Sequence, residues 1–97
     1  MLYLVSSSPH PANDEGLSER QRKFWDWMAR LEAEGRVLHG WRRMGRGAVV
    51  IFDVPDHGAL HDLLRQWAHL IPAAFDAQPL LARPGAAGDP PNTSPRR

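Results

Sequence analysis

Five consecutive apolar residues, Ala48-Val49-Val50-Ile51-Phe52, constrain the fold of this chain more than any other segment. Successive side chains of a strand point to opposite faces, so a strand that is apolar at every position must be covered on both faces. The chain has 97 residues, enough for one small domain and not for two. The fold must therefore cover both faces of this strand with little chain.

The segments around this strand predict further strands. Residues 36–44 also have strand length, and Gly45-Arg46-Gly47 makes a short turn to residues 48–54, so we expect a β-hairpin. Residues 1–5 are rich in strand formers and predict a first strand, which we expect Ser6-Ser7-Ser8-Pro9 to close.

Two segments have the apolar periodicity of amphipathic helices. The first runs from Leu17 to the predicted C-terminal cap Gly35, and the second starts at Pro55-Asp56 and ends at Ile71-Pro72. Apolar residues recur at i, i+3, i+4 and i+7 in both. They are Phe24, Trp27, Met28 and Leu31 in the first, and Leu60, Leu63, Leu64 and Trp67 in the second.

Residues 73–82 are predicted to form an edge strand, because Pro79 is tolerated only at a sheet edge or a bulge. The resulting order, βαββαβ, predicts an α+β, ferredoxin-like domain over residues 1–83, with a four-stranded antiparallel sheet and both helices on one face. A homodimer that packs sheet against sheet would cover the other face. Residues 84–97 contain four prolines and no large apolar side chain, and predict a mobile tail.

Composition excludes several function classes. The 12 basic and 11 acidic residues give a net charge of +1, which disfavours a nucleic-acid surface. The absence of cysteine removes disulfides, thiolate catalysis and thiolate metal sites. No apolar run approaches the roughly 20 residues that span a bilayer. We therefore expect a cytoplasmic protein with no membrane partner.

The sequence resembles the muconolactone isomerase family over residues 1–83. The matching pieces are Met1-Leu2-Tyr3, Glu34-Gly35, His39, Trp41, Arg42, Gly45, Phe52-Asp53-Val54-Pro55, Ala59-Leu60-His61-Asp62, Pro72, Leu81 and Arg83. The resemblance implies a dimeric α+β barrel, in which subunits pair through their sheets and dimers build a larger ring. It also implies that no cofactor is needed.

The resemblance further implies isomerisation of an unsaturated lactone, by removal of a proton beside the carbonyl and its return further along the conjugated system. This chain departs from the family pattern in the first strand, at Leu4 and Ser6, and in the first helix, at Phe24, Trp25 and Trp27. These changes predict a pocket that is more apolar and aromatic than one made for a small carboxylated lactone.

Three side chains that alternate along one strand are the main catalytic candidates. His39, Trp41 and Arg43 should project from one face, where His39 would move a proton, Trp41 would stack on a ring and Arg43 would hold an oxyanion. The competing interpretation is that His39 and Trp41 pack and that Arg43 is solvated. Arg42 also matches the family but projects from the opposite face, so it would bind the substrate if the pocket lies on that face or if its side chain reaches a partner subunit.

Further residues are assigned to the substrate or weighed as ligands. Tyr3 would offer its hydroxyl to a carbonyl, Trp25 would line the pocket or a subunit contact, and Phe52 would touch the substrate. His57 and His61 have metal-ligand spacing on one helix face, but a third ligand is lacking nearby, so no metal site is predicted.

The sequence thus predicts a muconolactone-isomerase-like enzyme that performs a cofactor-free proton-shift isomerisation or a cyclisation. Its substrate would be an unsaturated or aromatic, polyketide-like small molecule. Two alternatives stay open: a cofactor-independent monooxygenase of aromatic substrates, and a small-molecule binding protein without catalysis.

Overall fold

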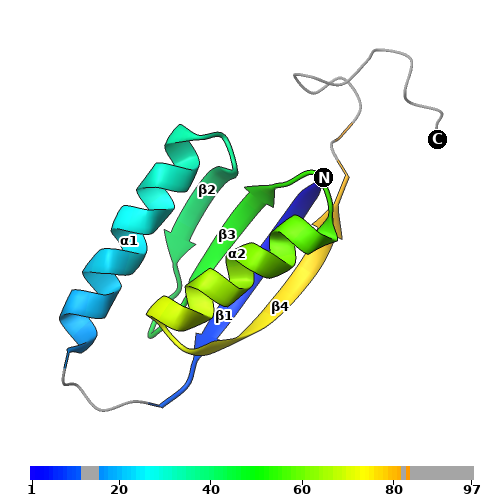
Figure 1. The fold of residues 1–97 in the computed structure, drawn as a ribbon. Coiled ribbons are helices and arrows are strands. Elements are labelled where there is room, and N and C mark those ends of the chain that lie inside the picture. The colour runs from blue at the N-terminus through cyan, green and yellow to red at the C-terminus, as the bar shows by residue number, and fades with distance from the viewer. Residues whose placement is uncertain (12–15, 82, 84–97) are drawn as a thin grey trace.

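The computed structural model describes residues 1–11, 16–81 and 83, and the predicted tail at residues 84–97 lies outside them. Four strands and two helices follow one another in the predicted order (Figure 1). They are β1 (Leu2–Pro9), α1 (Leu17–Ala33), β2 (Val37–Arg42), β3 (Ala48–Asp53), α2 (His57–Leu70) and β4 (Ala73–Leu80).

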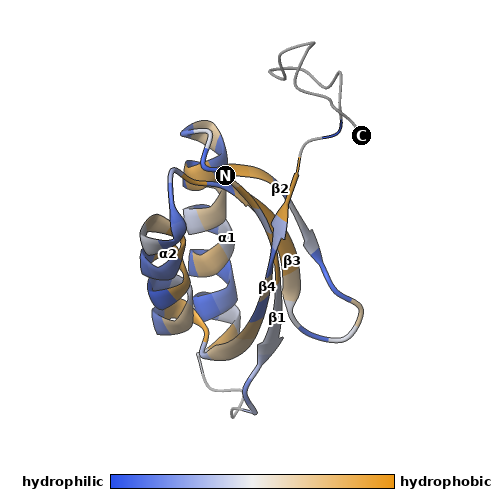
Figure 2. Cartoon of the chain, turned by 90° about the vertical axis from the view of Figure 1, so that its right-hand side faces the viewer, coloured by the Kyte–Doolittle hydropathy of each residue, from blue (hydrophilic) through white to orange (hydrophobic). Residues whose placement is uncertain are grey.

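The strands form one antiparallel sheet in the order β2-β3-β1-β4. Both helices lie on one side of the sheet, and none of the described elements lies on its other side (Figure 2). The ferredoxin-like βαββαβ fold predicted from the sequence is confirmed, and so is the position of β4, with its Pro79, at an edge. No described helix is long and apolar enough to cross a membrane.

Local signals set the helix ends where the sequence predicts them. Gly35 has a φ of 79° just after α1, and the Arg36 N–H donates to Leu31 O at 2.9 Å, so the glycine ends the helix in a left-handed turn. At the start of α2 the Asp56 carboxylate accepts a hydrogen bond from the Ala59 N–H at 2.8 Å.

The core lies between the sheet and the helices, and the two predicted apolar stripes face it. Tyr3 and Val5 of β1 alternate with residues of the open face, as do Ala48, Val50 and Phe52 of β3. The helices contribute Phe24, Trp27, Met28, Leu31, Leu60, Leu63 and Trp67.

The predicted end of the first strand is wrong, because β1 continues through Ser6-Ser7-Ser8-Pro9. Beyond Ser6, β1 pairs only with β4. Pro9, opposite Ala73, therefore lies where β1 has a neighbouring strand on one side only, a position in which proline is tolerated. The buried Ser7 hydroxyl accepts a hydrogen bond from the Ala48 N–H at 2.9 Å, where the β3 ladder has stopped.

Candidate functional site

A cavity of about 680 Å³ lies at the end of the sheet where β2 turns into β3. It is bounded by the end of β1, the first half of α1, the last turn of α2 and the β2–β3 turn. The lining residues are Ser7, Pro9, Gln21, Arg22, Phe24, Trp25, Trp41, Arg42, Arg43, Met44, Gly45, Arg46, Gly47, Ala48, Trp67 and Ile71.

One wall of the cavity is aromatic. Trp25 meets Phe24 edge to face with ring centroids 4.9 Å apart, and Phe24 lies 4.9 Å from Trp67. Trp25 also lies against the bare backbone of β2, because a Cβ at Gly40 would be 3.9 Å from its ring. Phe24 and Trp67 are buried, whereas Trp25 is partly exposed, so Trp25 offers the accessible part of this wall.

Arginines form the rim on the side of the β2–β3 turn, at Arg42, Arg43 and Arg46. The Arg43 guanidinium donates through Nη1 to Ser7 O at 2.8 Å and to the Ser8 hydroxyl at 3.3 Å. The side chain is therefore held in place while its Nε and Nη2 groups have no partner among the described residues. A guanidinium fixed in this way is prepared to bind an oxyanion.

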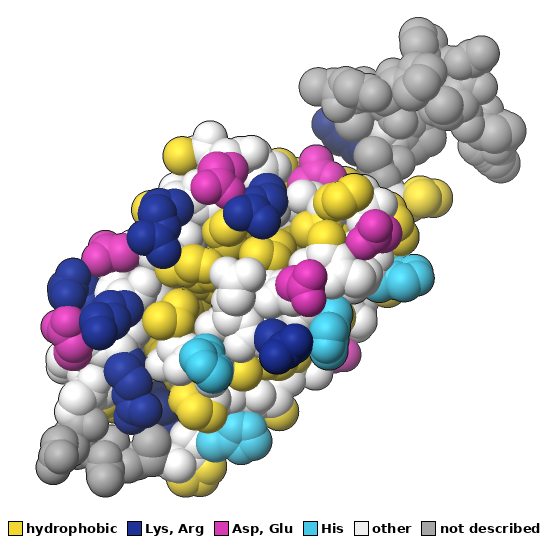
Figure 3. Space-filling view, in the orientation of Figure 1, with side chains coloured by type: hydrophobic (Ala, Val, Ile, Leu, Met, Phe, Trp, Pro, Cys, Tyr) yellow, Lys and Arg dark blue, Asp and Glu magenta, His cyan; other side chains and the backbone are white. Residues whose placement is uncertain are grey.

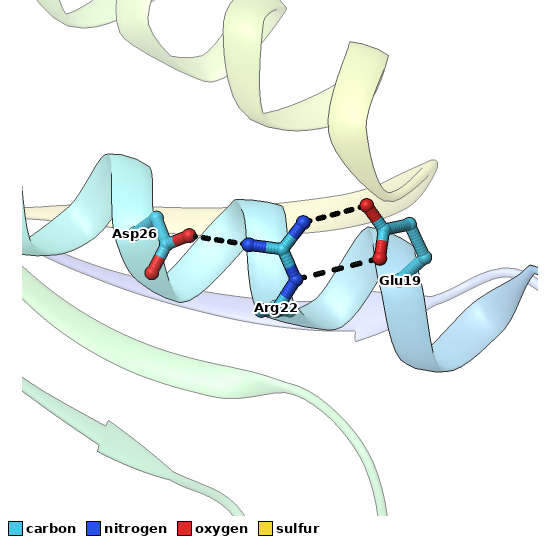
Figure 4. Close-up of polar contacts among 3 residues, drawn as sticks. All are labelled: Glu19, Arg22 and Asp26. Atoms are coloured by element: carbon cyan, nitrogen blue, oxygen red, sulfur yellow. Dashed lines mark hydrogen bonds and ion pairs between the residues drawn. The ribbon is translucent and has the colours of Figure 1, made fainter.

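A fourth arginine of the lining, Arg22 on α1, is already paired with carboxylates (Figure 4). Its guanidinium lies 2.6 Å from Glu19 and 3.0 Å from Asp26. The hydrogen bond and the charge of Arg22 lower the pKa of Glu19, and the same hydrogen bond, with both carboxylate charges, raises the pKa of Arg22. Arg22 therefore contributes less uncompensated charge than the arginines of the turn.

The residues that line the cavity include no Asp, Glu, His, Lys, Tyr or Cys within the described part of the chain. Their only ionisable side chains are arginines, which stay protonated at any ordinary pH. The cavity is thus equipped to bind negative charge, but a group that accepts a proton at neutral pH must come from outside its lining.

His39, the proton carrier predicted from the sequence, lies on the open face of the sheet, opposite Ile51. Its ring stacks on Trp41, with centroids 5.0 Å apart and planes inclined by 20°. Trp41 and Arg43 both border the cavity, so the structure brings these two predicted residues together. His39 is not in the lining and contacts the cavity only through the Trp41 ring. Arg42 pairs with the helix-facing Ala48, which agrees with its predicted projection from the other face of β2.

The other predicted substrate contacts lie elsewhere. Phe52 is fully buried in the core, and Tyr3, also buried, places its hydroxyl 3.1 Å from Nδ1 of His57 near the start of α2. Neither lines the cavity, and no pattern in the sequence pointed to the Tyr3–His57 pair. Among the described residues no cluster of three metal-binding side chains includes His57 and His61.

Sequence reasoning missed Ser7 and Arg46 as site residues. Ser7 was assigned to the end of a strand, and Arg46 to the turn Gly45-Arg46-Gly47. The Arg46 side chain reaches back toward β1, with Nη1 3.5 Å from His10 O. The density of arginines around this turn was the signal that could have found the rim.

A second groove lies on the outer surface of the helix layer. Lys and Arg side chains gather there mainly over α1 and histidines over α2, with hydrophobic side chains between them (Figure 3). The indole N–H of Trp27 donates to Gln66 Oε1 at 3.2 Å across the groove. Its other lining residues include Lys23, Asp26, Arg30, Asp62 and Arg65, so both signs of charge alternate there, unlike the cavity rim.

The fold and the cavity define a small ferredoxin-like α+β protein with an aromatic pocket rimmed by arginines. The chain belongs to the family described as a domain of unknown function, DUF3303, whose model matches residues 1–84. No protein with a curated description matches it.

Solved structures with a similar fold include two enzymes. Muconolactone isomerase shares 26% sequence identity, with a TM-score of 0.70, over 93% of this chain and 98% of that chain. The resemblance predicted from the sequence is thereby confirmed. The 5-chloro-2-hydroxyhydroquinone dehydrochlorinase of Burkholderia phenoliruptrix, solved with 2,5-dihydroxybenzoquinone, shares 19% identity and a TM-score of 0.61 over 84% of this chain and 94% of that chain. That likeness shows the fold alone.

Proposed function

We propose that the protein is an enzyme that shifts a proton, without a cofactor, within an unsaturated or aromatic small molecule, which it thereby isomerises or cyclises. The observation that carries the proposal is the cavity itself, whose lining combines aromatic side chains with the Arg43 guanidinium, which donates to Ser7 O. The two similar structures support it, because muconolactone isomerase is named for an isomerisation and the dehydrochlorinase binds a quinone ring.

The chemistry needs an oxyanion site and a proton carrier. When a proton leaves the carbon beside a carbonyl, the electron pair of the C–H bond moves toward the carbonyl oxygen, and the free donors of Arg43 would stabilise that charge. His39 would accept the proton and return it further along the conjugated system, with no net gain or loss of protons. Trp41, which touches the His39 ring and borders the cavity, would orient the substrate between them.

His39 also needs shelter from water, because it lies on the uncovered face of the sheet. In our proposal a second subunit packs its sheet on this face and encloses the histidine together with Trp41. The homodimer is therefore part of the catalytic proposal.

The direct test is turnover of muconolactone and of a panel of aromatic, polyketide-like compounds, followed in the ultraviolet and, in D2O, by deuterium incorporation into the product. His39→Ala should lower kcat by about 10²-fold or more, the usual contribution of a general base. Arg43→Ala should lower it similarly. His61→Ala, on the exposed side of α2, is the matched control and should keep full activity. Unchanged turnover in both site variants would overturn the assignment.

A binding protein without catalysis is the second candidate, favoured by the lack of a proton acceptor among the cavity-lining residues. In that case a ligand would quench tryptophan fluorescence and be recovered chemically unchanged. An oxygen electrode in the same assay addresses the monooxygenase alternative, because only an oxygenase would consume oxygen with the substrate.

A further inference from the structure

We propose that the ligand of the cavity is a planar aromatic anion of two or more fused rings, whose ionised oxygen is bound by Arg42, Arg43 and Arg46 and whose rings lie against Trp25. This inference names the substrate class of the site proposed above and rests on that proposal. The ionised oxygen belongs to a carboxylate or to an acidic hydroxyl, and both present the same negative oxygen to a guanidinium.

The charge of the rim requires an anion. Arg42 at the end of β2, with Arg43 and Arg46 in the turn that follows, borders the cavity, and no carboxylate among the described residues lies within 4.0 Å of these guanidinium groups. Arg43 and Arg46 donate to the main-chain oxygens of Ser7 and His10, which orient them without neutralising them. An anion therefore gains attraction at this rim that a neutral ligand does not.

The aromatic wall and the size of the cavity favour flat rings of some extent. The Trp25 ring meets Phe24 edge to face and has one ring edge near Gly40, and its exposed surface can stack on a flat ring. A cavity of about 680 Å³ falls within the range that holds ligands of drug size, and one six-membered ring would leave much of it filled by water.

The two recognition elements come from different parts of the fold, since Trp25 lies on α1 and the arginines lie at the end of β2 and in the turn after it. A ligand that touches both must carry its anionic group at one edge of a flat ring system.

The test compares four probes by titration calorimetry on the purified protein. 2-Naphthoate should bind at least tenfold more tightly than its neutral isostere 2-naphthamide and than the single-ring benzoate. 2-Hydroxy-1,4-naphthoquinone, which is ionised at neutral pH, tests the acidic hydroxyl against the carboxylate. Raising the salt concentration should weaken the binding of 2-naphthoate and of 2-hydroxy-1,4-naphthoquinone and leave the binding of 2-naphthamide unchanged.

Variants locate the binding. Arg42→Gln and Arg46→Gln should each lower the affinity for 2-naphthoate about tenfold, because each substitution removes a charge-assisted contact. Arg65→Gln makes the same change of charge on the exposed side of α2 and should bind normally. Trp25→Ala should lower the affinity for 2-naphthoate and for 2-naphthamide by the same factor. Arg43 stays intact in these experiments because it also holds the end of β1.

Each outcome decides the matter. Equal affinity for 2-naphthoate and 2-naphthamide, or normal binding by Arg42→Gln and Arg46→Gln with native circular dichroism, overturns the inference. Anion-selective binding supports it even if no probe or substrate is turned over, a result that would count against the proposed enzyme alone. Turnover of a neutral substrate together with no anion preference would leave the proposed enzyme standing and overturn the substrate class.

Discussion

Gly47 fixes the β2–β3 turn against β1 and thereby sets the position of the arginine rim. Its φ is +105°, and a Cβ at this residue would lie 2.3 Å from Ser7 O, the same oxygen that accepts from Arg43. We expect Gly47→Ala to lower the free energy of unfolding by about 3 kcal/mol or more, since left-handed strain costs roughly 1–2 kcal/mol and the backbone of the turn must also move away. Urea unfolding measures this loss.

Gly45→Ala is the matched control in the same turn. Gly45 also has a left-handed φ, of +87°, but a Cβ there would meet no atom within 4 Å. Its substitution should cost only the strain, about 1–2 kcal/mol. Equal losses in the two variants would show that the close approach to Ser7 does not hold the turn.

At the scale of the secondary-structure elements, α2 depends on the residue that caps its N-terminus. Asp56 caps the helix through the Ala59 N–H, and Asp56→Ala should lower the free energy of unfolding by about 1 kcal/mol, or the melting temperature by roughly 4–8 °C. Asp62→Ala, an exposed carboxylate in the middle of the same helix, should change stability by less than about 0.5 kcal/mol. If Asp56→Ala and Asp62→Ala had the same melting temperature, Asp56 would not be the stabilising cap of α2.

The start of α1 should show a pH-dependent contribution from Glu19. Because Arg22 lowers the pKa of Glu19 in the folded protein, the ionised pair stabilises the helix above the usual value of 4.5, and this contribution is lost as the pH falls through the lowered pKa. Glu19→Gln should therefore melt below the wild type at pH 6, and the two should converge in acid. A difference that persists or grows toward pH 2 would contradict the pairing, as would insensitivity of the difference to salt.

Local sequence patterns predict the helices and strands. Contacts between residues distant in sequence determine the end of β1 and the arrangement of the site, which local patterns do not predict. The stripe of Phe24 and Trp27, and the cap at Gly35, are readable because their partners lie within a few residues. The extension of β1 through Pro9 depends on pairing with β4 alone, which no local pattern reports. The same holds for the site. The alternation of residues along one strand predicts Trp41 and Arg43, whereas the proximity of Trp25 to Gly40 arises only when the chain folds.

For the whole molecule, the continuous apolar strand that constrains the sequence is covered on one side only within a single chain. Val50 of β3 is buried beneath the helices, whereas Val49 and Ile51 alternate with it on the open face and are partly exposed. Leu4 of β1 lies opposite Ile51 on that face. Apolar side chains at the centre of an exposed sheet are typical of a surface that packs against another subunit. We therefore predict a homodimer through this face.

The substitution Ile51→Glu tests the dimer and the catalytic proposal together. A carboxylate at the centre of two packed sheets would be buried without a partner, so the variant should sediment as a monomer where the wild type has twice the mass of the chain. Because the face is open in one chain, each monomer should still fold. The arginines and Trp25 that bind the anion in our proposal all belong to one chain, so 2-naphthoate should still bind, while turnover should fall because His39 is no longer enclosed. His61→Glu, on the opposite side of the molecule, should remain a dimer. A monomeric wild type, or full activity in monomeric Ile51→Glu, would show that catalysis needs no second sheet.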